Sequence, residues 1–261
     1  MRAFNGLLKK DLNLMKFWWM VWLVFMFLGM IGVYALSVYS SEPSIIVPFL
    51  MTIAAFQVFL APLSVLTVLN IEGKTQLWLY NPQSSIKLLL SKISSAAIIQ
   101  LIAQIFVSLY ALFVMKVLLN NGLIDSFNGF MPFKNGFLMQ LGIFGASMYI
   151  SIWCIFLWSV YHSLGKYPTI RSFRWIAVIL VCFAYNALEV LLTKTRLFKN
   201  ELFSFGVSIN IAPRMSYQEQ NGWAILQTDA HIPIMTICLY IVLSLIFFLL
   251  ASWLLDRKVE V

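Results

Sequence analysis

The sequence predicts an all-α, polytopic membrane protein, and composition, apolar run length and the charge pattern all point to it. Of its 261 residues 61% are hydrophobic and only 11% are charged, and the mean hydropathy is +0.88. A soluble domain cannot bury that much apolar surface. Several apolar runs also reach the roughly 20 residues that a helix needs to cross a bilayer. We therefore expect a single transmembrane domain over residues 1–261.

Six transmembrane helices are predicted. In chain order they cover Phe17–Tyr39, Ile45–Leu69, Ile93–Leu119, Gly136–Tyr161, Phe173–Thr193 and Ile232–Leu255, all within residues 17–255. The first run is too long for the apolar part of a signal peptide, so we expect it to stay as an anchor. More polar stretches separate these runs, and their charges indicate how the chain is oriented.

Charge and tryptophan placement both indicate that the two termini are cytoplasmic. The loops on the side of the termini hold twice as many Lys and Arg residues as the loops on the other side. This bias orients membrane proteins, and it explains the net charge of +8 without a nucleic-acid partner. Tryptophans gather at the same ends of the spans: Trp18, Trp19, Trp158, Trp175 and Trp253. We expect a multi-pass protein of the plasma membrane.

Residues 1–16 have the pattern of an amphipathic helix lying on the cytoplasmic surface. The apolar arc holds Phe4, Leu7, Leu8, Leu12, Leu14 and Met15, while Lys9 lies opposite and Lys10 lies at the flank. Asp11 interrupts the apolar arc. Its carboxylate either reaches water or a neighbouring lysine, or forms a salt bridge to another cytoplasmic element.

A cytoplasmic elbow is predicted over Glu72–Lys92, EGKTQLWLYNPQSSIKLLLSK, which is too polar to cross the membrane. Asn81-Pro82 should end a helix that begins near Glu72, because proline disfavours the helical conformation in the residue before it. Ser84 or Ser85 should then cap a second helix that continues into span three.

The elbow carries an apolar patch, Leu77, Trp78, Leu79 and Tyr80. A compact patch of this kind suits the pocket of a partner protein. The alternative is that these side chains rest on lipid or on the first helix.

The long third outer loop, residues 194–231, is also rich in apolar side chains: Phe198, Leu202, Phe203, Phe205 and Trp223. We expect it to fold back onto the membrane surface as short helices.

Polar amides are the main polar groups inside the predicted spans: Gln57, Gln100, Gln104, Gln140 and Asn186. Hydrogen bonding between helices is the favoured role, and lining a substrate path is the alternative. The few ionisable residues in the spans do not resemble a buried proton relay. No metal site is expected, since the cysteines and histidines lack metal-ligand spacing.

Sequence motifs argue against an enzyme. The chain contains neither G-x-x-x-x-G-K-[ST] nor H-E-x-x-H, so ATP binding by a P-loop and zinc hydrolysis of that type are not expected. If transport requires ATP, a separate chain must supply the ATPase.

The layout, together with the stretch LWLYNPQSSIKLLLSK, resembles the membrane subunit of ABC-2 type transporters, in particular Gram-positive exporters whose permease and ATPase are separate chains. The resemblance implies that the elbow, with Glu72, Leu77, Trp78, Leu79, Tyr80, Ser84 and Ser85, is the coupling helix that docks on the ATPase. Residues 1–16, with Lys9, Lys10 and Asp11, would be the connecting helix.

The resemblance also implies the partners. ATP and Mg would bind the separate ATPase subunit, and the permease would pair with a second permease chain, identical or related. The expected function is export of an amphipathic or hydrophobic substrate such as a peptide toxin, an antimicrobial peptide or a lipid-like molecule. Alternatives are an ion-coupled secondary transporter, for which carboxylates at mid-membrane would be expected, and an intramembrane enzyme.

Overall fold

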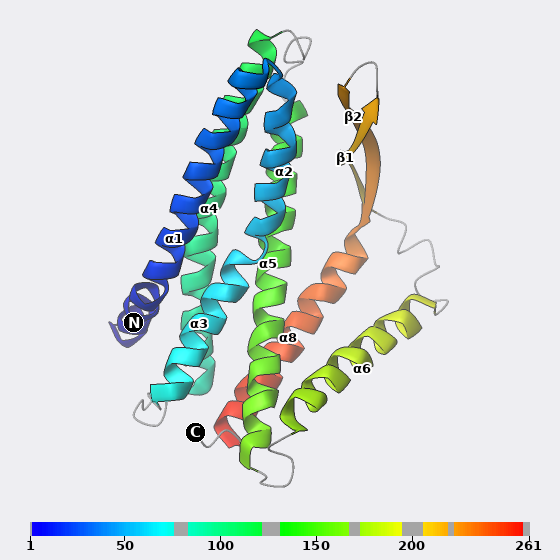
Figure 1. The fold of residues 1–261 in the computed structure, drawn as a ribbon. Helices are drawn as coiled ribbons and strands as arrows, with labels where there is room; N and C mark the ends of the chain where they lie inside the picture. Colours follow the sequence, from blue (N-terminus) through cyan, green and yellow to red (C-terminus); the bar gives the residue numbers. More distant parts are fainter. Residues whose placement is uncertain are drawn as a thin grey trace.

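A computed structural model describes residues 2–75, 83–121, 131–166, 173–194, 206–218 and 222–257 (Figure 1). Its helices are α1 (Arg2–Ser40), α2 (Ile46–Gln57), α3 (Leu60–Thr75), α4 (Ser85–Asn120), α5 (Met131–Ser163), α6 (Arg174–Lys194) and α8 (Ile234–Arg257). Two short 3-10 turns, η1 (Pro43–Ile45) and η2 (Leu164–Lys166), and two strands complete the described elements. Within the described residues, six helical stretches are long and apolar enough to cross a membrane. The structure therefore agrees with the predicted number of candidate spans.

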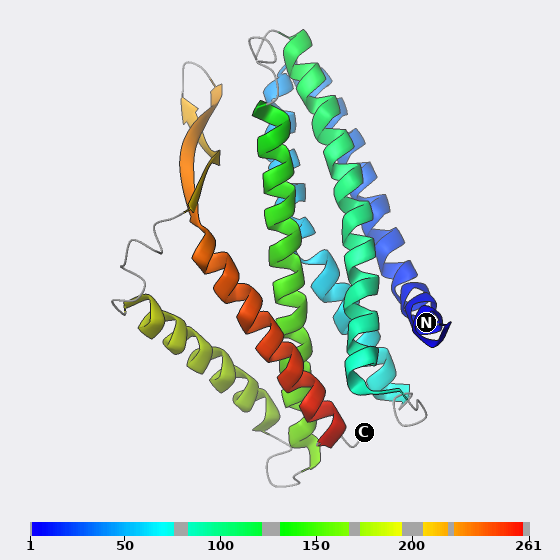
Figure 2. The ribbon, with the colours of Figure 1, turned by 180° about the vertical axis from the view of Figure 1, so that it is seen from behind.

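The helices form an elongated bundle with both chain termini at one end, which we call the terminal end (Figures 1 and 2). The largest core cluster lies toward this end, where Met15, Leu69, Leu89, Ile155 and Ala251 from five helices pack together. Helix α6 lies at the margin, and its most apolar 18-residue window contains no buried residue. The bundle is thus held most tightly at the terminal end.

Helix α1 is continuous from Arg2 to Ser40, so the predicted surface helix and span one form one helix. The predicted amphipathicity is confirmed: Lys9 and Lys16 are exposed, and Met15 is buried. Leu12 and Leu14 pack against the main core cluster. The apolar arc therefore contacts neighbouring helices.

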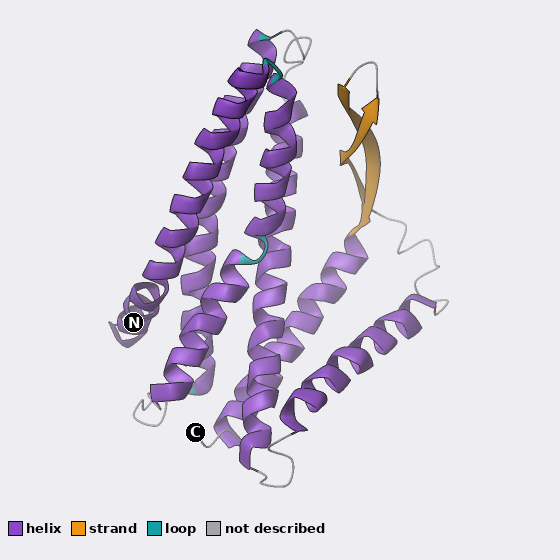
Figure 3. Ribbon diagram, in the orientation of Figure 1, coloured by secondary structure: helices purple, strands orange, loops and turns teal. Residues whose placement is uncertain are grey.

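The second span is interrupted, which differs from the continuous helix predicted over Ile45–Leu69. Helix α2 ends at Gln57 and α3 begins at Leu60 (Figure 3). Pro62 explains the break, because a proline within a helix has no N–H for the carbonyl four residues earlier, here that of Val58, and its ring clashes with that carbonyl. Val58 and Phe59 instead make tighter turns, with bonds to the carbonyls of Ala55 and Phe56.

The region just before α8 is a β-hairpin, so the prediction of short helices is wrong for that part of the loop. Strand β1 (Gly206–Gln218) pairs antiparallel with β2 (Gly222–Pro233), and a bulge interrupts the register between Asn210 and Ala212 (Figure 3). Residues 207–218 alternate apolar and small or polar side chains, VSINIAPRMSYQ, which is a strand pattern. Phe198, Leu202, Phe203 and Phe205 lie outside the described residues.

Candidate functional site: a buried charge cluster beside the elbow

Four charged side chains meet at the terminal end of the bundle, and we call them the charge cluster: Lys10, Asp11, Glu72 and Lys92. Lys92 Nζ lies 2.6 Å from Glu72 Oε2 and 3.7 Å from Asp11 Oδ1. Lys10 Nζ pairs with Glu72 Oε1 and lies 3.6 Å from Asp11 Oδ1. The charge cluster therefore joins the start of α1, the end of α3 and the start of α4.

Three of the four side chains in the charge cluster are deeply buried, and the cluster pairs two lysines with two carboxylates. Lys92 is 0% exposed, Asp11 1% and Glu72 2%, while the Lys10 side chain retains 36% exposure. The Ser91 hydroxyl donates a 2.6 Å hydrogen bond to Asp11 Oδ2. Buried ions need close partners and further hydrogen bonds to offset lost hydration. Two lysines and two carboxylates supply that pairing only when the three helices keep their positions.

Helical periodicity explains why these charges point inward. Asp11 is four residues from the buried Met15, and Glu72 is four from Val68. Lys92 is four residues from Leu88 and from Ala96, which are both buried. Residues three or four apart share one face of a helix. Each of these charged residues therefore lies on the buried, apolar face of its helix.

Helix α3 is also held by α5 on another side. Trp158 Nε1 donates a 2.9 Å hydrogen bond to Asn70 Oδ1, and the Trp158 ring stacks on His162 with centroids 3.8 Å apart. Gly73 permits this approach, because a Cβ there would lie 3.0 Å from the Trp158 ring. The sequence predicts Trp158 at the membrane interface, but its side chain is buried in the core at 6% exposure. The last turns of α3 are thus fixed between α1, α4 and α5.

The structure brings together some of the residues predicted for the coupling and connecting helices, and others lie apart or outside the described residues. Lys10, Asp11 and Glu72 come together, and the salt bridge considered for Asp11 is present. Lys9 is exposed. The prediction that a helix begins near Glu72 is wrong, since α3 continues through it to Thr75. Leu77, Trp78, Leu79, Tyr80 and Asn81-Pro82 lie outside the described residues.

The two elbow serines are placed at the start of α4. Ser84 occupies the N-cap position with an extended backbone (φ −63°, ψ 147°), but its side chain makes no capping hydrogen bond. The Ser85 hydroxyl instead bonds the Asp256 carboxylate near the end of α8. The predicted cap position is therefore correct for Ser84, while side-chain capping is absent there.

Lys92, Ser91 and Trp158 were not predicted as site residues. Burial of Lys92 could have been predicted from the sequence, because a lysine between Leu88, Leu89 and Ala96 lies on an apolar helix face. Its partners could not be identified from spacing, since they come from two other helices.

Two of the predicted amides connect helices. Gln100 Nε2 donates to the carbonyl of Gln57 at 3.1 Å, and Gln104 Nε2 donates to the carbonyl of Gln140 at 2.9 Å. Gln57 ends α2, so its carbonyl belongs to the last turn and lacks the usual helical partner. Asn186 is exposed on α6 and bonds the carbonyl of Cys182 in its own helix. The structure therefore does not bring Asn186 together with the three glutamines.

Within the described part of the chain, no group of three or more His, Cys, Asp or Glu side chains is placed to hold a metal ion. The arrangement at the charge cluster suits mechanical connection of helices, because its charged groups bond one another at the junction of three helices.

Comparison with known proteins finds one similar to this chain along its full length. The chain is 27% identical over 263 residues to the uncharacterized protein YhcE of Bacillus subtilis (strain 168), and the alignment covers 100% of both chains. No protein-family model matches the chain. No solved structure matches it either.

Proposed function

We propose that this chain is the membrane-spanning permease subunit of an ABC-2 type exporter, driven by a separate ATPase that docks on the elbow. The observation that carries the proposal is the charge cluster, which joins α1, α3 and α4 where α3 leads into the elbow and α4 leaves it. Both termini and the elbow would face the cytoplasm at the plasma membrane. A second permease chain, identical or related, would complete the transporter.

In this mechanism, ATP binding closes the ATPase pair and displaces the elbow. The displacement reaches the last turn of α3 and the first turns of α4, and the charge cluster transmits it to the start of α1. The hydrogen bond from Trp158 to Asn70 connects the same end of α3 to α5. The break at Val58 and Phe59 lets α3 tilt while α2 stays in place, since sharp kinks occur where the helical hydrogen-bond ladder is interrupted.

The cargo proposed is amphipathic or hydrophobic. Many large apolar side chains are exposed along the spans, for example Phe25, Leu28, Phe183 and Leu245. A cargo of matching character could move partly within the lipid phase. Energy would come from ATP and Mg bound by the partner chain.

Replacing both Trp78 and Leu79 with Ala tests the docking role. We expect the double variant to insert into the membrane normally but to lose co-purification with a P-loop ATPase, because buried aromatic anchors dominate many protein interfaces. The measurement is mass spectrometry of the affinity-purified chain, scoring proteins that contain G-x-x-x-x-G-K-[ST].

A matched control replaces Trp175 and Leu180, which are 59% and 61% exposed on α6, with Ala. This variant should retain the ATPase. Unchanged ATPase recovery in the Trp78 and Leu79 variant would contradict docking through the elbow.

A further inference from the structure

One line of exposed side chains runs along most of α1, and we call it the α1 stripe. Its members recur three or four residues apart, so they share one side of the helix. All of them are exposed: Lys9, Asn13, Lys16, Met20, Val24, Phe27, Ile31, Tyr34 and Val38. Another side of the same helix carries Asp11, Met15, Met26 and Met30, which are buried in the bundle. The described part of the chain therefore leaves the α1 stripe largely uncovered.

The apolar part of the α1 stripe has the length of a membrane core. It extends from Met20 to Val38, which is about 27 Å at 1.5 Å per residue, and the hydrocarbon core of a bilayer is about 30 Å thick. Every member of the stripe in this range is aliphatic or aromatic. Acyl chains therefore cover this part of the stripe when α1 spans the bilayer.

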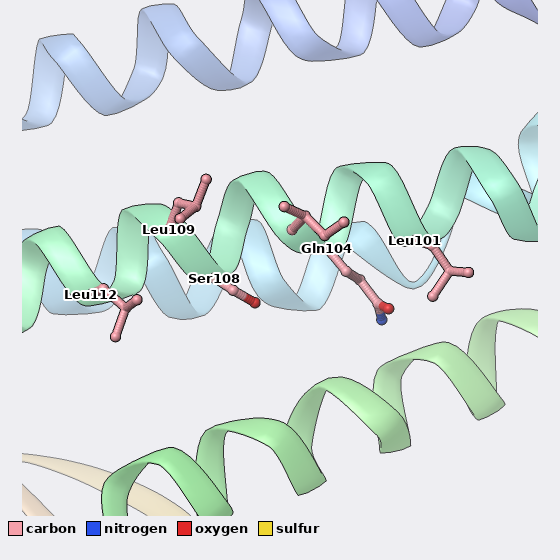
Figure 4. A pocket seen from close by; sticks show the side chains of 6 residues that line it. Leu101, Gln104, Ser108, Leu109 and Leu112 are labelled. Atoms are coloured by element: carbon pink, nitrogen blue, oxygen red, sulfur yellow. The ribbon is translucent and has the colours of Figure 1, made fainter.

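The exposed side of α4 gives a matching position for the bilayer. Lys87 and Lys116 are exposed near its two ends. The helix between them is about 44 Å long, and a bilayer with its headgroup layers is about 40 to 45 Å thick. Figure 4 shows the shallow, uncharged hollow between the two lysines, where Leu101 and Leu112 line α4 and the Gln104 amide points toward α5. Lys87 therefore marks the headgroup layer at the terminal end.

The basic part of the α1 stripe lies in and just outside this headgroup layer. Lys16 is about 6 Å along the helix from Met20, and each headgroup layer is roughly 5 to 7 Å thick. Lys9 is about 10 Å beyond Lys16, close to the Debye length of about 8 Å over which a charged membrane surface acts. Lys16 is thus placed to contact a lipid phosphate, and Lys9 to be attracted by the negative potential of the surface.

The charges of Lys9 and Lys16 favour an anionic partner. Neither lysine forms an ion pair with another described residue, whereas Lys10 and Lys92 are both paired in the charge cluster. A zwitterionic headgroup balances its own phosphate with its ammonium group, so it offers the lysines little net charge. An anionic headgroup brings a negative charge that the lysines can balance.

We propose that the α1 stripe binds anionic phospholipid in the leaflet at the terminal end, which is the cytoplasmic leaflet in the proposed orientation. Lys16 contacts the phosphate, Lys9 strengthens the attraction, and the acyl chains lie along Met20 and Phe27. A symmetric contact with a second copy along this stripe would bring lysine against lysine, which disfavours that partner. The inference is independent of the proposed function, because it involves neither an ATPase nor a cargo.

Photolabelling of the purified full chain, without ATPase, tests the proposal in nanodiscs of mixed phosphatidylcholine and phosphatidylglycerol. The probes are trace amounts of the same two lipids, each with a diazirine next to the headgroup. We expect the phosphatidylglycerol probe to label the peptide around Lys16 about fivefold more than the phosphatidylcholine probe, the factor for one lysine at an anionic surface. Salt at 1 M should reduce this preference, since it shortens the Debye length to about 3 Å.

Two substitutions separate the contributions of the lysines. Lys16→Gln should remove most of the preference for phosphatidylglycerol, and Lys9→Gln should remove less, because electrostatic attraction falls off within a Debye length of the surface. Lys116→Gln is the matched control, since it removes the same charge from an exposed position near the other end of α4. This control should label at α1 like the wild-type chain.

A double variant, Lys9→Arg with Lys16→Arg, keeps both charges and should keep the preference. It separates loss of charge from loss of folding. Equal labelling of the wild-type chain by both probes would overturn the proposal. The same loss of preference in the Arg variant as in the Gln variants would also overturn it.

A photo-crosslinking amino acid in place of Asn13 identifies what covers the basic end of the α1 stripe. In the same nanodiscs we expect an adduct with phospholipid, and glycerol phosphate in solution should not reduce its yield. A covalent dimer of this chain would overturn the proposal by assigning the stripe to a second copy. Competition by glycerol phosphate would overturn it in favour of a site for free anions.

Discussion

Lys92→Met is expected to destabilise the protein by about 3 to 5 kcal/mol, the usual cost of breaking a buried ion pair from one side. Lys92 is fully buried and lies against the carboxylates of Glu72 and Asp11. Without it, the cation left beside the two buried carboxylates among the described residues is Lys10, which is partly exposed. The measurement is the free energy of unfolding in detergent, followed by tryptophan fluorescence.

Lys87→Met is the matched control for Lys92→Met, since Lys87 is exposed on the same helix. An exposed substitution of this kind should change the free energy of unfolding by no more than about 0.5 kcal/mol. Equal stability of the two variants would show that the charge cluster does not hold the three helices together.

Trp158→Ala is expected to cost about 3 to 5 kcal/mol, the range for truncating a large buried aromatic side chain. The change removes a core side chain, its hydrogen bond to Asn70 and its contact with the Gly73 backbone. The contact between the last turns of α3 and α5 should then weaken, while Leu69 and Ile155 still pack in the main core cluster. Unfolding in detergent measures the loss of stability.

Trp175→Ala removes the same type of side chain from an exposed position and should leave the free energy of unfolding almost unchanged. A Trp158→Ala variant as stable as Trp175→Ala would contradict the role assigned to the contact between α3 and α5.

The spans were predictable from the sequence because hydrocarbon permits only segments whose backbone groups bond internally, and long apolar runs identify such helices. The break in span two could also have been predicted, since Pro62 removes the hydrogen-bond donor for one backbone carbonyl in that span. The alternation in residues 207–218 indicated a strand, but the apolar content of the whole loop favoured surface helices instead.

Only part of the charge cluster could be predicted from the sequence. The position of Asp11 within an apolar arc left contact with water or a neighbouring lysine and a salt bridge to another element both open, and the structure supplies Lys92 as a partner on another helix. That pairing depends on how α1, α3 and α4 pack, which no local pattern encodes. The same holds for Trp158, whose interfacial character in sequence gave no sign of Asn70 or Gly73 as its neighbours.

The most direct test of coupling through the elbow places a photo-crosslinking amino acid at position 78 in cells. The account predicts an adduct with a separate chain that contains G-x-x-x-x-G-K-[ST], and a changed adduct yield when ATP hydrolysis is blocked. Adducts with lipid or with this chain alone would contradict it.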